Sequence, residues 1–185
     1  MERTAIPPEL LPQIAAGDEG AFERLYRATY RQVYSFLLSL TMNQDDAKDL
    51  LQETYIRVHG SAHLYREQGN PMAWIMKIGR NLFLMEKRKK TAIPIDTDTI
   101  QMQKELSFDN ITNVESKLYL EELFTILTEE ERTIVVLHSA AGFRHREIAE
   151  FLDMPLGTVL SKYNRAMKKL EAAAKKSMSG GSDVR

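Results

Sequence analysis

The chain has no cysteine, few glycines and no long apolar run. Without cysteine, it can form neither a disulfide framework nor a reactive thiolate. No uninterrupted apolar stretch approaches the roughly 20 residues that span a bilayer, and the N-terminal residues lack the pattern of a signal peptide. Nine glycines among 185 residues, with little alternation of β-branched side chains, favour an all-α fold. These absences indicate a soluble protein of the cytoplasm with no membrane insertion.

Charge is balanced over the whole chain but separated along it. The net charge of −1 argues against indiscriminate binding to nucleic acid. Residues 162–176 carry six basic side chains and one acidic side chain, whereas residues 104–131 carry eight acidic and two basic ones. This separation indicates that different surfaces meet different partners.

Helical periodicity in the first half predicts one small domain over residues 1–90. A short helix is expected over residues 9–16, and longer helices over residues 18–40, 45–59 and 71–90. Asp18 and Asn43 precede two of them and suit the N-cap position. In the last helix the spacing of four apolar residues predicts a stripe toward the core: Ile75, Ile78, Leu82 and Met85.

The helix expected over residues 45–59 has an acidic outer side. Asp45 and Asp46 lie in its first turn, where a negative charge suits the helix dipole. Asp49, Gln52 and Glu53 have no such structural reason and form a compact polar patch. A patch of this kind can pair with the basic side chains of a partner helix.

The helix expected over residues 71–90 combines an aromatic ring with amide and cationic groups. Trp74, Lys77, Asn81 and Arg88 share one stripe, and the helix ends in the basic run of residues 87–90. This combination suits a polyanion whose bases can be stacked or separated. The alternative is a buried helix with a solvated basic end.

Residues 91–113 lack sustained periodicity and read as a flexible linker. A second small helical domain is expected over residues 114–174, followed by a disordered tail over residues 175–185. Within this domain, Thr128 to Glu131 fits a capping box, and Gly142 ends the helix that follows.

The segment from Glu147 to Leu170 fits a helix-turn-helix. Asp153 stands at the turn, where a left-handed backbone is wanted. Val159 and Ala166 are expected to hold the second helix to the first. Five residues are then expected to point outward, where they can donate to base edges and phosphates in a major groove: Thr158, Ser161, Lys162, Arg165 and Lys169. The alternative is an ordinary helical hairpin with a basic face.

Six motifs in order resemble the extracytoplasmic-function (ECF) class of bacterial RNA polymerase sigma factors, the two-domain members of the sigma-70 family (group 4). They are Gly17-Asp18 with Ala21-Phe22 and Leu25-Tyr26, residues 45–55, residues 71–75 with 78–81, Leu127-Thr128 with Glu131-Arg132 and residues 134–137, Ile148-Ala149, and residues 157–159. The resemblance covers nearly the whole chain and implies a transcription initiation factor that binds core RNA polymerase.

The resemblance assigns roles to both domains. The first domain (sigma region 2) would bind the polymerase and hold the non-template strand of the −10 element during melting, and the second (region 4) would read the −35 element as duplex. The implied polymerase contacts are Asp46, Asp49, Gln52 and Glu53. The implied −10 contacts are Tyr65, Asn70, Trp74, Lys77, Arg80, Asn81, Lys87 and Arg88. The implied −35 contacts are Arg144, Thr158, Ser161, Lys162, Arg165 and Lys169.

Three positions depart from the family pattern. Leu160 stands where a basic residue is usual, Arg144 replaces a capping hydroxyl, and Asp153 replaces the turn glycine. These departures leave the fold intact and bear on the sequence preference at −35. An anti-sigma partner is implied by the family alone.

Catalysis by the chain itself is not expected. No nucleophile stands with a base, and no glycine loop suits a phosphate, so neither an enzymatic site nor a cofactor is predicted. His59 and His63 share a helical spacing, but a zinc site usually needs three or four ligands, so no metal is predicted. Two other classes stay open: a one-component transcription regulator, and an all-α interaction module such as a sigma antagonist.

Overall fold

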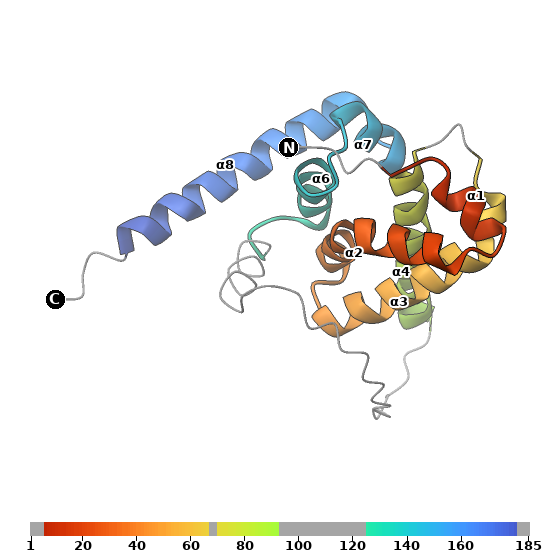
Figure 1. The fold of residues 1–185 in the computed structure, drawn as a ribbon. Coiled ribbons are helices and arrows are strands. Elements are labelled where there is room, and N and C mark those ends of the chain that lie inside the picture. Colours follow the sequence, from red (N-terminus) through yellow and green to blue (C-terminus); the bar gives the residue numbers. More distant parts are fainter. Residues whose placement is uncertain (1–5, 67–69, 93–124, 181–185) are drawn as a thin grey trace.

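The computed structural model describes residues 6–66, 70–92 and 125–180, and all regular elements in these ranges are helices. The expected all-α fold is therefore confirmed. The elements, shown in Figure 1, are α1 (Leu10–Ala15), α2 (Glu19–Thr41), α3 (Gln44–Ser61), the 3-10 turn η1 (Ala62–Leu64), α4 (Pro71–Ala92), α6 (Glu129–Ser139), α7 (His145–Leu152) and α8 (Leu156–Gly180).

Side-chain caps set the starts of the longer helices. The Asp18 carboxylate accepts a hydrogen bond from the Ala21 amide at 3.0 Å. The Asn43 side chain accepts from two amides of the first turn of α3. Thr128 begins α6 with a complete capping box. Each cap satisfies amides that have no partner inside the helix, which confirms the caps expected from the sequence.

Helices α1 to α4 form what we call the front bundle. Its core contains Leu25, Phe36 and Leu37 from α2, Leu50 from α3 and Ile75 from α4, each no more than 1% exposed. Gly79 lies where α4 crosses the other two helices, because a Cβ there would stand 3.0 Å from Leu37 and from Thr54. The glycine of α4 thus lies where this helix comes close to α2 and α3.

The expected inward stripe of α4 is wrong at its end. Ile75 and Leu82 are buried, but Met85 is 48% exposed, while Met76 takes a core position at 0%. Ile78 is half-buried. Met85 lies on the border between α3 and α4 next to Leu82. Helical periodicity predicts which side of a helix a side chain lies on. It does not predict how far along the helix a partner helix covers that side.

Helices α6 to α8 form what we call the rear module. Helix α6 lies between α2 and α8 (Figure 1). Helices α7 and α8 are joined by a three-residue break, in which Asp153 adopts φ 56° and ψ 49°. Ile148 and Val159 are fully buried between the two helices. The predicted helix-turn-helix is present.

The front bundle and the rear module share one apolar core. Phe36 of α2 meets Phe151 of α7 edge-on, with ring centroids 5.7 Å apart. Arg132 Nε of α6 donates to the Ser39 carbonyl of α2 at 3.2 Å. The sequence predicted two domains and gave no sign of this contact, since no pattern along the chain records which surfaces meet.

Two boundaries differ from the expected ones. Helix α4 continues to Ala92, and α8 continues to Gly180, into the segment for which a disordered tail was expected. A run of three alanines and two lysines over residues 172–176 has high helix propensity, and the Lys175–Glu171 ion pair spans one turn there. The rest of the expected linker, residues 93–113, lies outside the described residues. None of the helices in the described ranges combines the length and apolarity needed to cross a bilayer.

Candidate polymerase and nucleic-acid interfaces

Helix α3 carries the predicted polymerase-binding residues on one side. Asp49 and Gln52 are exposed, and Asp46 and Glu53 are half-buried. Their spacing of three, four and seven residues places them on neighbouring turns of one helical face. Glu53 pairs with Arg57 Nε at 2.8 Å, so part of its charge is already neutralised. Asp49 and Gln52 are the most accessible members of the patch.

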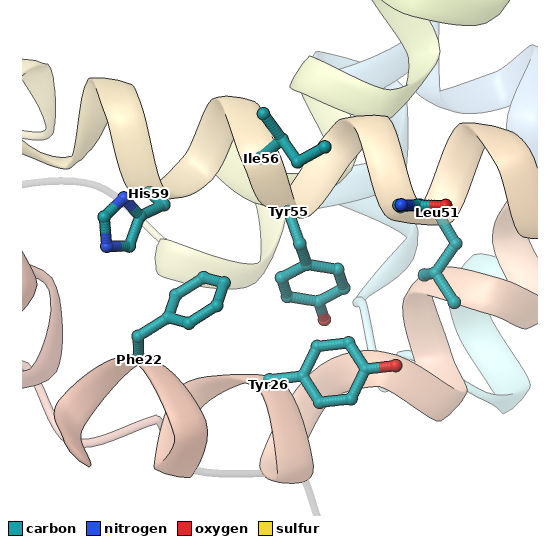
Figure 2. A pocket seen from close by; sticks show the side chains of 7 residues that line it. Phe22, Tyr26, Leu51, Tyr55, Ile56 and His59 are labelled. Atoms are coloured by element: carbon teal, nitrogen blue, oxygen red, sulfur yellow. The ribbon is translucent and has the colours of Figure 1, made fainter. Parts of the chain in front are cut away.

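An apolar groove borders this patch, between α2 and α3 (Figure 2). Its volume is about 490 Å³. Figure 2 shows Phe22 and Tyr26 of α2 facing Tyr55 and His59 of α3. The full lining is Phe22, Tyr26, Leu51, Gln52, Tyr55, Ile56 and His59. The sequence analysis did not predict this groove.

Hydrogen bonding fixes the floor of the groove. The Thr29 hydroxyl donates to the Leu25 carbonyl at 2.6 Å. Its single proton is thereby used, so the Tyr55 hydroxyl, 2.6 Å from Thr29 Oγ1, is the donor in that contact. Burial raises the pKa of Tyr55. The groove is therefore preformed and carries a neutral phenol at its base.

A second groove separates α3 from α4. It has a volume of about 590 Å³ and reaches from Ile56 and Arg57 to Asn81 and Met85. Ile56 is 58% exposed and borders both grooves. An exposed isoleucine between two grooves gives this side of α3 an accessible apolar surface.

The predicted −10 residues lie along α4 and just before it. Asn70 caps the helix, since its Oδ1 accepts from the Met72 amide at 3.0 Å. Tyr65 and Trp74 meet with ring centroids 5.5 Å apart at 65°, which places two predicted aromatic contacts side by side. Lys77 and Asn81 are exposed. Arg80 is half-buried, and residues 67–69 lie outside the described residues.

The basic end of α4 reaches the rear module. Lys87 Nζ donates to Glu129 Oε2 of α6 at 3.0 Å and lies 5.5 Å from the centre of the Phe83 ring. Arg88 and Lys89 are exposed. Both partners of the Lys87–Glu129 pair are about half exposed, so the pair contributes at most about 1 kcal/mol. Lys87 can therefore exchange this carboxylate for a phosphate at little cost.

Helix α7, the first helix of the helix-turn-helix, has an uncommon residue at each end. Arg144 begins α7 without a hydroxyl cap, and the Glu147 carboxylate accepts from the Arg144 amide at 2.7 Å instead. The guanidinium of Arg144 stays exposed. At the other end of α7, Asp153 holds the left-handed turn and the Met154 amide donates to the Ala149 carbonyl at 2.9 Å. Neither departure from the family pattern prevents the motif from forming.

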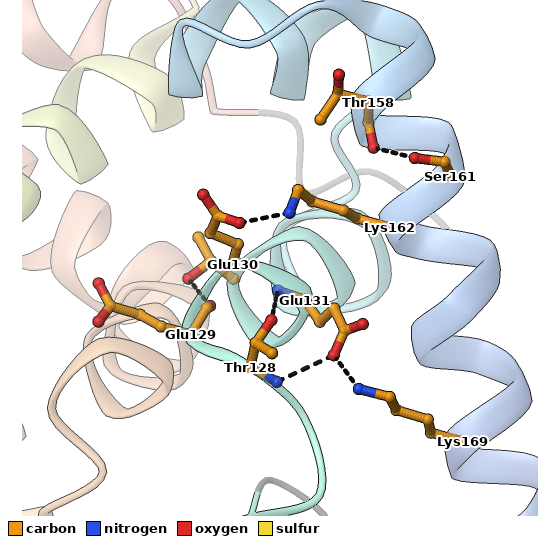
Figure 3. A network of polar contacts seen from close by, with 9 residues as sticks. Thr128, Glu129, Glu130, Glu131, Thr158, Ser161, Lys162 and Lys169 are labelled. Carbon is orange, nitrogen blue, oxygen red and sulfur yellow. Dashed lines mark hydrogen bonds and ion pairs between the residues drawn. The ribbon is translucent and has the colours of Figure 1, made fainter.

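Two predicted −35 lysines are engaged with α6 (Figure 3). Lys162 pairs with Glu130, and Lys169 Nζ lies 2.7 Å from Glu131 Oε2. Glu131 is only 2% exposed. Burial alone would raise the pKa of Glu131, but hydrogen bonds from Lys169 and from the Thr128 amide outweigh it and leave that pKa below its ordinary value. Lys169 therefore has a structural role as the counter-ion of a buried carboxylate.

The outer side of α8 carries a different set from the one expected. Ser161 and Arg165 are exposed as predicted, while Thr158 is half-buried. Leu160 and Asn164 are also exposed there, and sequence reasoning assigned neither of them to the DNA face. Their positions, four residues apart and next to Ser161 and Arg165, could have indicated this face.

Three rings join the helices of the rear module. His138 of α6 stacks on His145 of α7 at 4.4 Å, and Tyr163 of α8 meets both rings edge-on at 4.9 and 4.7 Å. His138 Nδ1 lies 2.9 Å from the Phe143 carbonyl, an acceptor, so this nitrogen carries the proton. The part of the chain that the structure describes holds no cluster of three or more residues suited to a metal ion.

Comparison with known proteins agrees with this geometry. A family model of sigma-70 region 2 matches residues 25–93, and one of sigma-70 region 4 matches residues 117–170. The ECF RNA polymerase sigma factor EcfG of Rhodopseudomonas palustris is 32% identical over 75% of this chain and 76% of its own length. SigE of Mycolicibacterium smegmatis, also an ECF sigma factor, is 32% identical over 84% of this chain, which spans 63% of that relative's length.

Two solved structures share the fold. CnrH, solved with the cytosolic domain of CnrY, aligns with a TM-score of 0.66 and 20% identity over 93% of this chain and 99% of its own. The sigma factor RpoE of Bartonella quintana, solved with the anti-sigma factor NepR, aligns with a TM-score of 0.63 and 23% identity over 83% and 96%. Two helical modules, a helix-turn-helix at the end of the second and these matches lead to one conclusion: the chain belongs to the ECF sigma factors of RNA polymerase, which are transcription initiation factors.

Proposed function

We propose that this chain binds core RNA polymerase through α3 and directs the enzyme to promoters with a −35 and a −10 element. The observation that carries the proposal is the presence in one chain of an accessible acidic patch on α3 and a helix-turn-helix with an exposed, donor-bearing α8. The first feature suits a basic partner helix and the second suits duplex DNA. A factor with both can bring a polymerase to a chosen sequence. It supplies no catalytic group of its own.

In this proposal, α4 and the residues before it hold the single strand of the −10 element. The Tyr65–Trp74 pair offers ring surface on which an unstacked base can lie, and Lys77 and Asn81 stand exposed on the following turns. Stacking on an aromatic side chain contributes about 1–3 kcal/mol per base, comparable to the cost of unstacking one step. Lys87 and Arg88 would then follow the phosphates.

The rear module reads the −35 element as duplex. Arg144, Ser161 and Arg165 are the predicted contacts that face solvent. Lys162 and Lys169 support the same surface from its flank, where their ion pairs with α6 fix the orientation of α8.

An anti-sigma factor is the partner we propose for the apolar groove between α2 and α3. RpoE and CnrH were each solved with a second protein, and the RpoE partner is named an anti-sigma factor. A preformed groove of aromatic and aliphatic side chains next to exposed Ile56 suits the apolar face of an amphipathic helix. Occupation of this groove would cover Gln52 and so compete with the polymerase.

Reconstitution tests the main proposal. The purified chain is added to core polymerase with a library of promoters, and run-off transcripts are sequenced. We expect transcripts from defined start sites only when both proteins are present. Binding of the free chain to an operator as a dimer, without any effect on start-site choice, would instead identify a one-component regulator.

Charge reversal tests the polymerase contact. Asp49→Lys and Glu53→Lys should weaken the association of the chain with core polymerase at least tenfold in a binding titration. Glu86→Lys makes the same change of charge on the exposed part of α4 and should have little effect. Equal affinities for all three variants, with unchanged circular dichroism, would exclude the α3 patch as the contact.

A further inference from the structure

The outermost strip of α8 carries uncharged side chains beside its basic ones, and two of the lysines expected there lie elsewhere. Val159 and Ala166 are fully buried and define the inner side of the helix. Thr158 is half-buried, and Lys162 and Lys169 lie on one flank, held by glutamates of α6. With 100° between successive residues, the side opposite the core carries Gly157, Leu160, Ser161, Asn164, Arg165 and Lys168.

Leu160 and Asn164 are uncharged side chains on this strip, and each has a preferred base. Leu160 is 40% exposed, so its side chain can contact a ligand of this face. Asn164 follows it by one turn, so the two Cβ atoms are about 5–6 Å apart. Gly157 lies one turn before Ser161, and a Cβ there would meet no atom within 4 Å, so the backbone at the start of α8 can approach a ligand closely.

Each side chain has one preferred partner in a major groove. An apolar side chain contacts the C5-methyl group of thymine, and an asparagine bonds N6 and N7 of adenine. Base pairs are stacked about 3.4 Å apart, so two side chains one helical turn apart reach the same or adjacent pairs. Residues 156–170 contain no acidic side chain that could accept from cytosine.

We propose that Leu160 and Asn164 determine the −35 preference of this protein, with Leu160 against a thymine methyl group and Asn164 against adenine of the same or an adjacent A·T pair. This inference rests on the proposed function, since it assigns base contacts to the duplex-reading face of α8. The inference also explains what the leucine does at a position where the family usually has a basic residue. A basic side chain there would contact guanine or a phosphate, whereas leucine contacts the methyl group of thymine.

Selection with the reconstituted holoenzyme identifies the base that each side chain reads. The probe is a pool of duplexes randomised across the −35 and −10 blocks. The wild-type protein should enrich an upstream element with A·T pairs at one position or two adjacent positions. Leu160→Ala should lose the thymine preference there, and Leu160→Arg should shift it toward guanine. Asn164→Ala should lose the adenine preference at the same or the adjacent pair by about tenfold. Met167→Ala removes a side chain of equal exposure, 41%, two turns further along α8 and should change nothing.

Base analogues then test single atoms. Replacing the selected thymine by uracil removes only its methyl group and should weaken binding of the wild-type holoenzyme about fourfold. The same replacement should have no effect on the Leu160→Ala holoenzyme. Replacing the selected adenine by 7-deazaadenine should weaken binding for the wild type and not for Asn164→Ala.

Three results would overturn the inference. One is a selected upstream element without A·T pairs at the positions that Leu160 and Asn164 variants alter. Another is equal binding of thymine and uracil duplexes. The third is a Leu160→Ala protein that loses affinity for core polymerase but keeps the selected sequence, because Leu160 would then be a protein contact. If the wild-type holoenzyme enriches no upstream element at all, the proposed function fails as well, and that outcome is distinct from the other three.

Discussion

Three consecutive glutamates at the start of α6 each hold a lysine from another helix. Glu129 pairs with Lys87 of α4, and Glu130 and Glu131 pair with Lys162 and Lys169 of α8. Only Glu131 is buried, so the three pairs differ in strength even though they are neighbours in the sequence. The Lys87–Glu129 pair, with both side chains about half exposed, can exchange with phosphate, whereas the Lys169–Glu131 pair must stay intact to keep a buried carboxylate paired.

Removing the partner of Glu131 should therefore cost more than removing both groups. We expect Lys169→Met to lower the free energy of unfolding by about 2 kcal/mol, because it leaves a buried charge unpaired. The double variant Lys169→Met, Glu131→Gln should recover part of that loss. Urea unfolding followed by circular dichroism measures both. Lys168→Met, one residue away on an exposed position, serves as the control. A loss as small as that of the control would contradict the buried role of Glu131.

The same carboxylate gives a pH dependence with a definite sign. The pKa of Glu131 lies below its ordinary value of 4.5 in the folded protein. The pair therefore contributes its full stability above about pH 4.5, and this contribution is lost as the pH falls through the folded pKa. Wild-type protein should lose more unfolding free energy between pH 5 and pH 3 than Glu131→Gln does. Identical slopes for the two proteins would argue against the pairing.

His145 should make the rear module sensitive to mild acid. Burial lowers the pKa of His145, and a charge on stacked His138 lowers it further. The unfolded chain then takes up the proton first, so stability falls as the pH drops below about 6.5 and levels off below the folded pKa. His145→Phe should remove this loss between pH 7 and pH 5. His63→Phe changes an exposed ring instead and should keep it, as unfolding titrations at several pH values can measure.

At the scale of single elements, the sequence predicted where helices begin better than where they end. A cap such as Asn43 or Thr128 is a local contact between residues two or three apart, so it can be read from the chain directly. The burial of Met85 was predicted wrongly and the pairing of Lys162 with Glu130 was not predicted, because each depends on which surface of another helix lies nearby. The groove between α2 and α3 was missed for the same reason. It needs Phe22 and His59, which are 37 positions apart, to face each other.

Two glycines in the helices of the front bundle should respond to alanine with opposite signs. Alanine normally stabilises a helix by about 0.5–1 kcal/mol relative to glycine. A Cβ added at Gly60 would meet no atom within 4 Å, so Gly60→Ala should stabilise by about this amount. At Gly79 the Cβ would press on Leu37 and on Thr54, whose hydroxyl already donates to the Leu50 carbonyl at 2.6 Å. Overpacking of about 1–3 kcal/mol then exceeds the helix gain, so Gly79→Ala should lower the melting temperature. A rise for both variants would show that α4 can move away from α2.

At the scale of the whole molecule, the observed arrangement is too small for the proposed task. The predicted −10 and −35 residues lie close together, because Lys87 and Lys162 pair with two neighbouring glutamates of α6, Glu129 and Glu130. The centres of the two promoter elements are about 25 base pairs apart, or about 85 Å at 3.4 Å per pair. If the chain binds both elements as proposed, the front bundle and the rear module separate first. We therefore expect the contacts between them that involve Phe151 and Arg132 to belong to the free protein.

This separation can be measured directly because the chain has no cysteine of its own to react with a dye. Gly60→Cys on α3 and Glu150→Cys on α7 place one label on the front bundle and one on the rear module, both at exposed positions. Energy transfer between them should be high in the free chain and should fall when core polymerase and promoter DNA are added, since the labels move apart with the two modules. A Glu23→Cys, Gly60→Cys pair lies wholly in the front bundle and should report no change. If transfer between the modules stays high in a complex that starts transcription, the closed arrangement is compatible with initiation, and simultaneous binding of both promoter elements by this chain is excluded.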